Sequence, residues 1–110
     1  MKNWYNVEIS MTGECEVTDE LVETVAESIG FKDTDIDERE VYKLVAVFSS
    51  DDAPDVIHAR ISILLENRPE IFYIDLLYRV DDEMLPERIT YWQGGNVQTY
   101  RTHVIYEEVE

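Results

Sequence analysis

Segments that alternate apolar and polar residues, separated by two helical patterns, constrain the possible fold most strongly. The clearest alternation spans residues 5–12, where every second residue is apolar: Tyr5, Val7, Ile9 and Met11. Successive side chains of a strand point to opposite faces of a sheet, so such a segment predicts a strand with one buried face. A Gly-containing turn follows it at residues 13–14.

The next pattern is helical and has recognisable signals at both ends. Thr18 is a good N-cap, Asp19 and Glu20 fall in the first turn, and Gly30 is a good stop signal. One face of this predicted helix is apolar, with Leu21, Val22, Val25, Ala26 and Ile29. We therefore expect residues 18–30 to pack as an amphipathic helix on a sheet.

Two contrasting segments follow this helix. Residues 31–40 are rich in acids, which predicts either a loop or a short edge strand, because charges protect sheet edges from unwanted pairing. Residues 41–49 are almost continuously apolar and rich in β-branched side chains, which predicts a central strand.

A second helix is expected from about Asp52 to Asn67, with Pro54 in its first turn and Pro69 beyond its end. Its apolar arc is wide and runs from Ala59 and Ile63 round to Leu65. His58 falls on its polar side.

The C-terminal part reads as three more strands. Residues 71–80 predict a strand whose buried face holds Phe72, Ile74, Leu76, Tyr78 and Val80. After a turn at residues 81–86, residues 88–93 and 97–107 predict a hairpin around Gly94-Gly95-Asn96.

This order of elements predicts one α+β domain over residues 1–110, with two helices on one face of an antiparallel sheet. If residues 31–40 contain a strand, residues 1–80 match the element order of the split β-α-β, ferredoxin-like plait, with the hairpin as a C-terminal extension. The match concerns element order alone, and the plait hosts many functions, so it predicts none.

The charge narrows the choice of partners. The chain of 110 residues holds 25 acidic and 9 basic residues, a net charge of −16. Nucleic acids and anionic membranes are bound through clusters of cations, so neither is an expected partner. A basic protein is the electrostatically favoured partner, and solubility alone is the simpler explanation of the charge.

The sequence carries no recognisable catalytic or metal-binding motif. Cys15, His58 and His103 fall in three different predicted elements, without the spacing of metal ligands. Asp33, Asp35 and Asp37 start like a calcium loop, but Glu38 stands where the loop needs glycine and Leu44 where it needs the bidentate glutamate. We therefore expect no metal, no cofactor and no enzymatic activity. The single cysteine excludes an internal disulfide and favours the cytoplasm.

Candidate partner-binding residues come from three places. Tyr73, Tyr91, Trp92 and Tyr100 are aromatic residues of predicted strands, which complete the core or form an interface. Arg60 lies within the apolar arc of the second helix, where it pairs with a carboxylate such as Asp75 or enters an interface. The width of that arc, including Ile63, predicts a homodimer that uses the second helix or a sheet edge.

These observations favour a non-catalytic protein-binding or regulatory module. The first alternative is a mimic of nucleic acid, of the kind found in small viral or phage inhibitors. Its carboxylates, Asp33, Asp35 and Asp37 among them, would occupy the basic groove of a DNA-binding protein. A small enzyme or a subunit of a larger assembly are further alternatives.

Overall fold

The computed structural model describes residues 3–78 and 87–101. Within these ranges the chain forms β1 (Asn3–Met11), α1 (Asp19–Ile29), β2 (Thr34–Arg39), β3 (Lys43–Ser50), α2 (Pro54–Asn67), β4 (Ile71–Tyr78), β5 (Glu87–Trp92) and β6 (Val97–Arg101). The predicted turn at residues 81–86, Val80 and the end of the predicted last strand, with His103, lie outside the described residues. The hairpin around residues 94–96 is confirmed.

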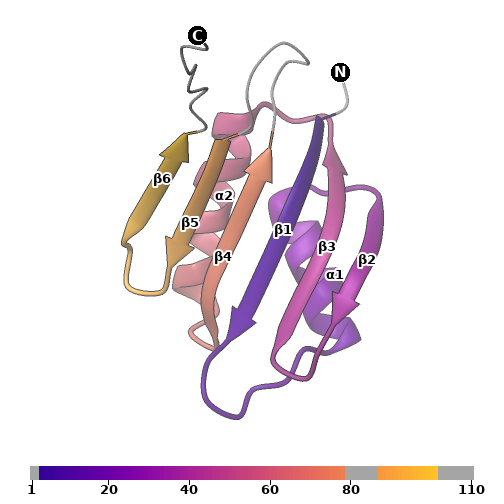
Figure 1. Ribbon diagram of the computed structural model, residues 1–110, viewed down its shortest axis with the longest axis vertical. Helices are drawn as coiled ribbons and strands as arrows, with labels where there is room; N and C mark the ends of the chain where they lie inside the picture. The colour runs from indigo at the N-terminus through magenta and orange to yellow at the C-terminus, as the bar shows by residue number, and fades with distance from the viewer. Residues whose placement is uncertain (1–2, 79–86, 102–110) are drawn as a thin grey trace, which may run out of the picture.

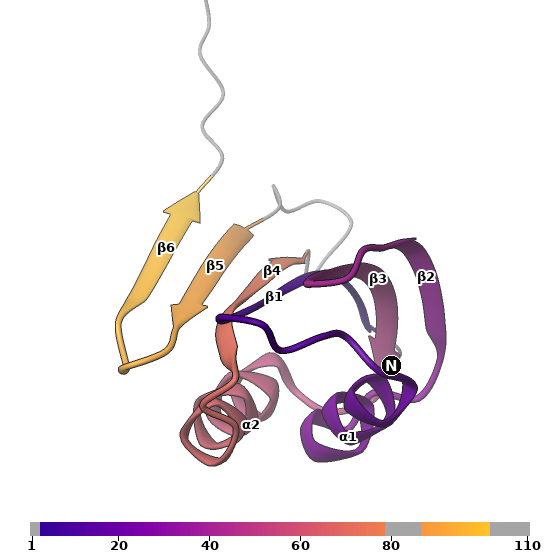
Figure 2. The same cartoon turned by 90° about the horizontal axis from the view of Figure 1, so that it is seen from below.

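The six strands form one antiparallel sheet in the order β2-β3-β1-β4-β5-β6 (Figure 1). Both helices lie on the same side of the sheet, α1 beneath the β3 half and α2 beneath the β4 half (Figure 2). The expected α+β arrangement of two helices on an antiparallel sheet is therefore confirmed. The sheet has six strands, and its strand order as a whole therefore differs from that of the four-stranded ferredoxin-like plait.

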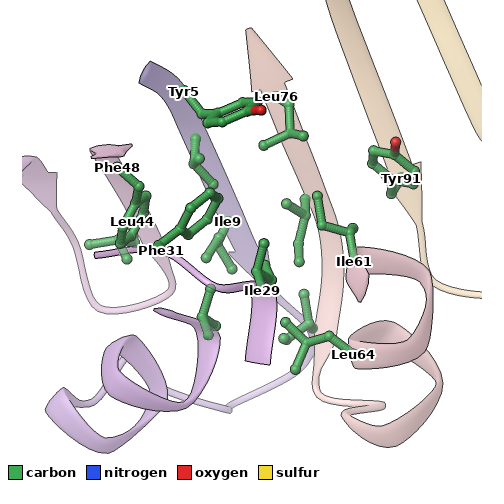
Figure 3. Packing of buried hydrophobic residues seen from close by; sticks show 14 of the residues in the cluster. Tyr5, Ile9, Ile29, Phe31, Leu44, Phe48, Ile61, Leu64, Leu76 and Tyr91 are labelled. Carbon is green, nitrogen blue, oxygen red and sulfur yellow. The ribbon is translucent and has the colours of Figure 1, made fainter. Parts of the chain in front are cut away.

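The core lies between the sheet and the two helices. The central strand β1 supplies Tyr5, Val7 and Ile9, all of which are almost completely buried, as its alternating pattern predicts. Side chains from α1, α2 and the neighbouring strands pack against them (Figure 3). Removing this apolar surface from water is the main source of stability of such a two-layer domain.

The acidic segment 31–40 contains an edge strand, which was one of its two predicted forms. All six residues of β2 are exposed, and the register against β3 shifts between Ile36 and Glu38. The predicted strand over residues 41–49 begins later, at Lys43, because Val41 and Tyr42 form the exposed β2–β3 turn.

The predicted buried face of β4 is wrong at its first position. Ile71 is buried and pairs with Met11, whereas Phe72 is 46% exposed. The register against β1 shifts between Ser10 and Met11, and this irregularity places Phe72 outside the regular alternation. Ile74, Leu76 and Tyr78 then follow the predicted alternation and are buried.

Both end signals of α1 are confirmed. The Thr18 hydroxyl accepts a hydrogen bond from the Leu21 amide at 3.1 Å. Gly30 adopts the left-handed conformation with φ of 89°, and its amide donates to the Ala26 carbonyl at 3.0 Å.

Arg60 pairs with a different carboxylate from the one named in the sequence analysis. Its Nη1 donates to Asp52 Oδ2 at 2.7 Å and to the carbonyl of Ile29 at 3.1 Å. Asp75, on the sheet, instead accepts hydrogen bonds from Arg88. Arg60 thus joins the C-terminal end of α1 to the start of α2, which is a structural role.

Gln93 anchors the C-terminal hairpin to the rest of the domain. Its Nε2 lies 2.9 Å from the Leu65 carbonyl, 3.1 Å from that of Arg68 and 3.0 Å from that of Ile71. Two of these carbonyls belong to the end of α2, where a helix leaves its own acceptors unsatisfied. A single side chain therefore holds β5, α2 and the start of β4 together.

We expect Gln93→Leu to lower the free energy of unfolding by about 1–3 kcal/mol, because leucine keeps the volume but removes both amide donors. Urea unfolding followed by circular dichroism would measure the loss. Gln98→Leu is the matched control: within the described residues the side chain of Gln98 makes only exposed hydrogen bonds, to Trp92 and Tyr100, so this variant should cost about 0.5 kcal/mol or less. Equal losses in the two variants would contradict the anchoring role of Gln93.

Candidate functional site

The side of the sheet that faces away from both helices, here called the open face, carries a continuous set of polar and aromatic side chains. The register places Glu8 opposite Asp75, Asp75 opposite Thr90, and Tyr73 opposite Trp92, so these residues share one side. The alternate residues of the same strands, such as Ile74, Leu76 and Ile89, are buried on the helix side. The open face therefore displays side chains that the core does not use.

Three aromatic rings gather on this face, and we call Phe72, Tyr73 and Trp92 the aromatic cluster. The ring centroids lie 5.3 Å apart for Phe72 and Trp92, 5.1 Å for Tyr73 and Trp92, and 5.9 Å for Phe72 and Tyr73. These are normal separations for attractive tilted or edge-to-face pairs. The cluster is consequently a preformed surface of rings from two adjacent strands.

Ionic contacts fix the tyrosine of the cluster. The Tyr73 hydroxyl donates to Glu8 Oε2 at 2.7 Å, and Lys43 Nζ lies 3.0 Å from Glu8 Oε1. Partial burial alone would raise the pKa of Glu8, but the hydrogen bonds from Tyr73 and Lys43 lower it overall. Burial and the neighbouring Glu8 raise the pKa of Tyr73. At neutral pH Glu8 is thus a carboxylate and Tyr73 a neutral donor.

A second polar group lies beside the cluster. Asp75 is buried, and its carboxylate accepts from Arg88 Nε at 2.9 and 3.0 Å and from the Thr90 hydroxyl at 2.7 Å. A buried carboxylate is tolerated when charged and polar donors satisfy it in this way. The side chains that surround the aromatic rings are therefore held in place by their own partners.

The hairpin strand β6 continues the surface. Gln98 Oε1 accepts from Trp92 Nε1 at 3.3 Å and from the Tyr100 hydroxyl at 3.0 Å. The Tyr100 side chain is 52% exposed. Trp92 and Tyr100, which sequence reasoning singled out, are thus brought together on the open face through one glutamine.

Tyr91, a third aromatic residue predicted for partner binding, belongs to the core instead. It is buried on the helix side of β5 (Figure 3), and its hydroxyl contacts His58 Nδ1. His58 Nε2 lies 3.2 Å from the Tyr78 hydroxyl, which donates to Glu87 Oε2 at 3.3 Å. Since that hydroxyl has only one proton, it accepts from His58 Nε2, and Tyr91 donates to Nδ1.

Burial sets the ionisation of this internal chain of hydrogen bonds. It lowers the pKa of His58, although the charges of Asp55 and Glu87 act in the opposite direction. Burial, reinforced by Glu87, raises the pKa of Tyr78 to about 12, and burial also raises the pKa of Tyr91. His58 was assigned to the polar side of its helix, but it is half-buried and joins α2 to β4 and β5.

The remaining predicted residues lie away from the open-face aromatic cluster. Asp35 and Asp37 are exposed on β2, at the opposite edge of the sheet from β5 and β6, and Asp33 just before β2 accepts from the Ser49 hydroxyl at 2.9 Å. Ile63 is 56% exposed on α2. Within residues 3–78 and 87–101, no group of three or more His, Cys, Asp or Glu side chains could hold a metal ion.

Sequence reasoning missed most of the polar residues that frame the cluster. Glu8, Lys43, Asp75 and Arg88 are ordinary charged residues of strands, and only the pairing of strands distant in sequence brings them together. The available signal was period-two alternation, which already placed Glu8 on the face opposite Val7 and Ile9.

Comparison of the chain with protein-family models, with curated proteins and with solved structures finds no match in any of the three. Neither helix of the described residues is long and apolar enough to cross a membrane. The physical chemistry of the open face is therefore the basis for a functional assignment.

Proposed function

We propose that this chain is a non-catalytic protein-binding module whose recognition surface is the open face of the sheet. The observation that carries the proposal is the aromatic cluster: Phe72, Tyr73 and Trp92 lie partly exposed on the sheet, on the side opposite the two described helices α1 and α2. We also propose that β1 to β4 with the two helices form a ferredoxin-like plait that the hairpin β5–β6 widens.

Tryptophan and tyrosine dominate the energetics of protein interfaces, because they bury a large area and lose few rotamers on binding. Trp92 lies between Phe72 and Tyr73 on one side and the Gln98–Tyr100 pair on the other. Its indole is already hydrogen-bonded to Gln98 and in edge-to-face and tilted contact with Phe72 and Tyr73, so little ordering remains when a partner binds. This arrangement supports Trp92 as the central contact.

The charge supports a basic partner. The two carboxylates of the open face nearest the cluster, Glu8 and Asp75, are neutralised by Lys43 and Arg88. The acids described on α1 and β2 lie away from this centre, on the helix side and at the far edge of the sheet. Long-range attraction would steer a protein with a basic rim, and apolar contact at Trp92 would hold it.

We expect Trp92→Ala to weaken binding by about 2 kcal/mol, roughly thirtyfold. The tagged wild-type chain and the variant would be immobilised at equal density and exposed to lysate of the source cell. Mass spectrometry would then quantify each retained protein. Tyr42→Ala is the matched control, because Tyr42 is an exposed aromatic residue at the β2–β3 turn, outside the cluster. Circular dichroism would show that both variants are folded.

Equal recovery of every protein by wild type and Trp92→Ala would reject the open face as the recognition surface. Loss of a partner from Tyr42→Ala alone would indicate that the interface lies at the β2–β3 turn and not on the open face. Both outcomes are distinguishable from the expected one, in which a basic protein is lost from the Trp92 variant only.

Mimicry of nucleic acid is a second candidate, and one observation favours it. A groove of about 520 Å³ runs between α1 and β2, with Asp19 and Glu23 on its helix side. The exposed acids Asp35 and Asp37 belong to β2 as well, but they alternate with the groove residues Thr34 and Ile36 and do not line the groove. The floor of the groove is apolar, with Val22, Ala26 and Ile36, unlike a DNA backbone. Competition between this chain and DNA for a basic protein, abolished by salt, would support mimicry.

A further inference from the structure

The two edges of the sheet are built in opposite ways. Edge strand β2 lies in a segment, residues 31–40, with five acids and two bases, and its ladder contains a register shift. Edge strand β6, Val97–Arg101, contains no acid and no proline, and its register against β5 is continuous. Charges and bulges are the devices that prevent edge pairing, so β2 is protected, and within residues 3–78 and 87–101 β6 is the edge that can accept a further strand.

The hydrogen-bonding directions show which groups of β6 are available. The Trp92 amide donates to the Asn96 carbonyl at 2.9 Å, so Trp92 and Asn96 form a hydrogen-bonded pair. This pair continues the β5–β6 ladder, in which Tyr91 lies opposite Val97 and Ile89 opposite Thr99. Antiparallel pairs alternate between hydrogen-bonded and non-hydrogen-bonded. The amides and carbonyls of Gln98 and Tyr100 therefore point to β5, and those of Thr99 and its odd-numbered neighbours in β6 point to the free edge.

The strand that fits this edge best is a second copy of β6 itself. Antiparallel pairing about a two-fold axis at Thr99 sets Val97 opposite Arg101 and Gln98 opposite Tyr100, with no two acids face to face. The acids of β2 are five strands away, which is about 24 Å or three Debye lengths at physiological salt. Repulsion between the β2 acids of two copies is consequently small when the copies meet at β6.

We propose that two copies of this chain associate through their β6 edges into one continuous antiparallel sheet. The pairing is isologous and closes on itself, because β2 cannot continue it. A two-fold axis perpendicular to the sheet leaves both open faces on the same side, with the two Tyr100–Gln98 pairs adjacent at the centre. The assembled dimer would then present two aromatic clusters to a partner, which adds avidity to the proposed binding function.

The test is the mass of the full-length chain in solution, by size-exclusion chromatography with light scattering over a wide range of protein concentration. Wild type is expected to show twice the mass of one chain. Thr99→Pro removes the amide that points to the free edge while sparing the ladder to β5, and it should raise the dimer dissociation constant by about tenfold or more. Thr99→Glu, which sets two carboxylates face to face on the axis, should do the same at low salt.

Thr34→Pro is the matched control on the other edge. The Ser49 amide donates to the Asp33 carbonyl, so the Thr34 amide points to the free edge of β2 in the same way. This variant should remain dimeric. A one-chain mass for wild type at every concentration, or a dimer unchanged by both Thr99 variants, would overturn the proposal. If Thr99→Pro fails to fold by circular dichroism, Thr99→Glu alone decides.

Discussion

Gly30→Ala is expected to lower the free energy of unfolding by about 3 kcal/mol. Gly30 has a φ of 89°, a conformation that costs alanine about 1–2 kcal/mol. A Cβ at this position would also come within 2.4 Å of Arg60 Nη1 and 2.6 Å of Asp52 Oδ2. The added methyl group would therefore displace the contact that joins α1 to α2, as well as straining the backbone.

Two further variants separate these contributions. Gly13→Ala is the matched control, because Gly13 has a φ of 59° and open space around it, so only the backbone cost of about 1–2 kcal/mol applies. In an Arg60→Ala background the cost of Gly30→Ala should fall toward the same range, since the guanidinium is gone and the Asp52 carboxylate, no longer held by it, can turn away. Urea unfolding of wild type, Gly30→Ala, Gly13→Ala, Arg60→Ala and the double variant measures these costs. A Gly30→Ala cost no larger than that of Gly13→Ala would contradict the crowding.

Alkaline pH is expected to destabilise the protein through its buried tyrosines. A tyrosine in the unfolded chain titrates near its ordinary pKa of 10, whereas that of Tyr78 is raised to about 12 in the folded protein. The folded state then holds more protons than the unfolded state above pH 10, so stability falls as pH rises. Tyr78 makes its full contribution to the free energy of unfolding below pH 10. By pH 12 about 2 kcal/mol of that contribution is lost. Tyr91, whose pKa is also raised, acts in the same direction.

Unfolding free energies measured in urea between pH 8 and 12 would test this dependence. Tyr78→Phe should start less stable at pH 8, because it breaks the hydrogen bonds with His58 and Glu87, and it should lose less stability as the pH rises. Tyr42→Phe, at an exposed ring, should follow wild type closely. Parallel curves for wild type and Tyr78→Phe would show that Tyr78 does not carry the dependence.

Much of the fold could be predicted from the sequence because its signals are local. Thr18 and Gly30 mark the ends of α1 through capping, and the alternation around Val7 and Ile9 identifies β1 and its buried face. The hairpin follows from the glycines at residues 94–95. These signals depend only on neighbours within a few residues, so they can be recognised in the sequence without knowledge of the tertiary structure.

The candidate site could be predicted only in part, because it depends on pairing between distant strands. Trp92 and Tyr100, two candidate interface residues, lie on the open face, but Tyr91, one residue away from Trp92, points into the core. Which of two adjacent aromatic residues faces a helix depends on the register with β4, and nothing local fixes that register. The displaced Phe72 escaped prediction for the same reason, because its position depends on the register shift between β4 and β1. The partner of Arg60, in contrast, is Asp52, only eight residues away along the chain.

In the proposed function, aromatic contact on the open face holds the partner, and the acids of the chain only steer it. The most direct measurement compares how much of a given basic protein is retained by Trp92→Ala and by the combined variant Glu20→Gln, Glu23→Gln and Glu27→Gln, whose acids are exposed on α1. We predict that retention is largely lost with the first and largely kept with the second. Retention kept by the Trp92 variant and lost on neutralising α1 would contradict the account and favour mimicry of nucleic acid.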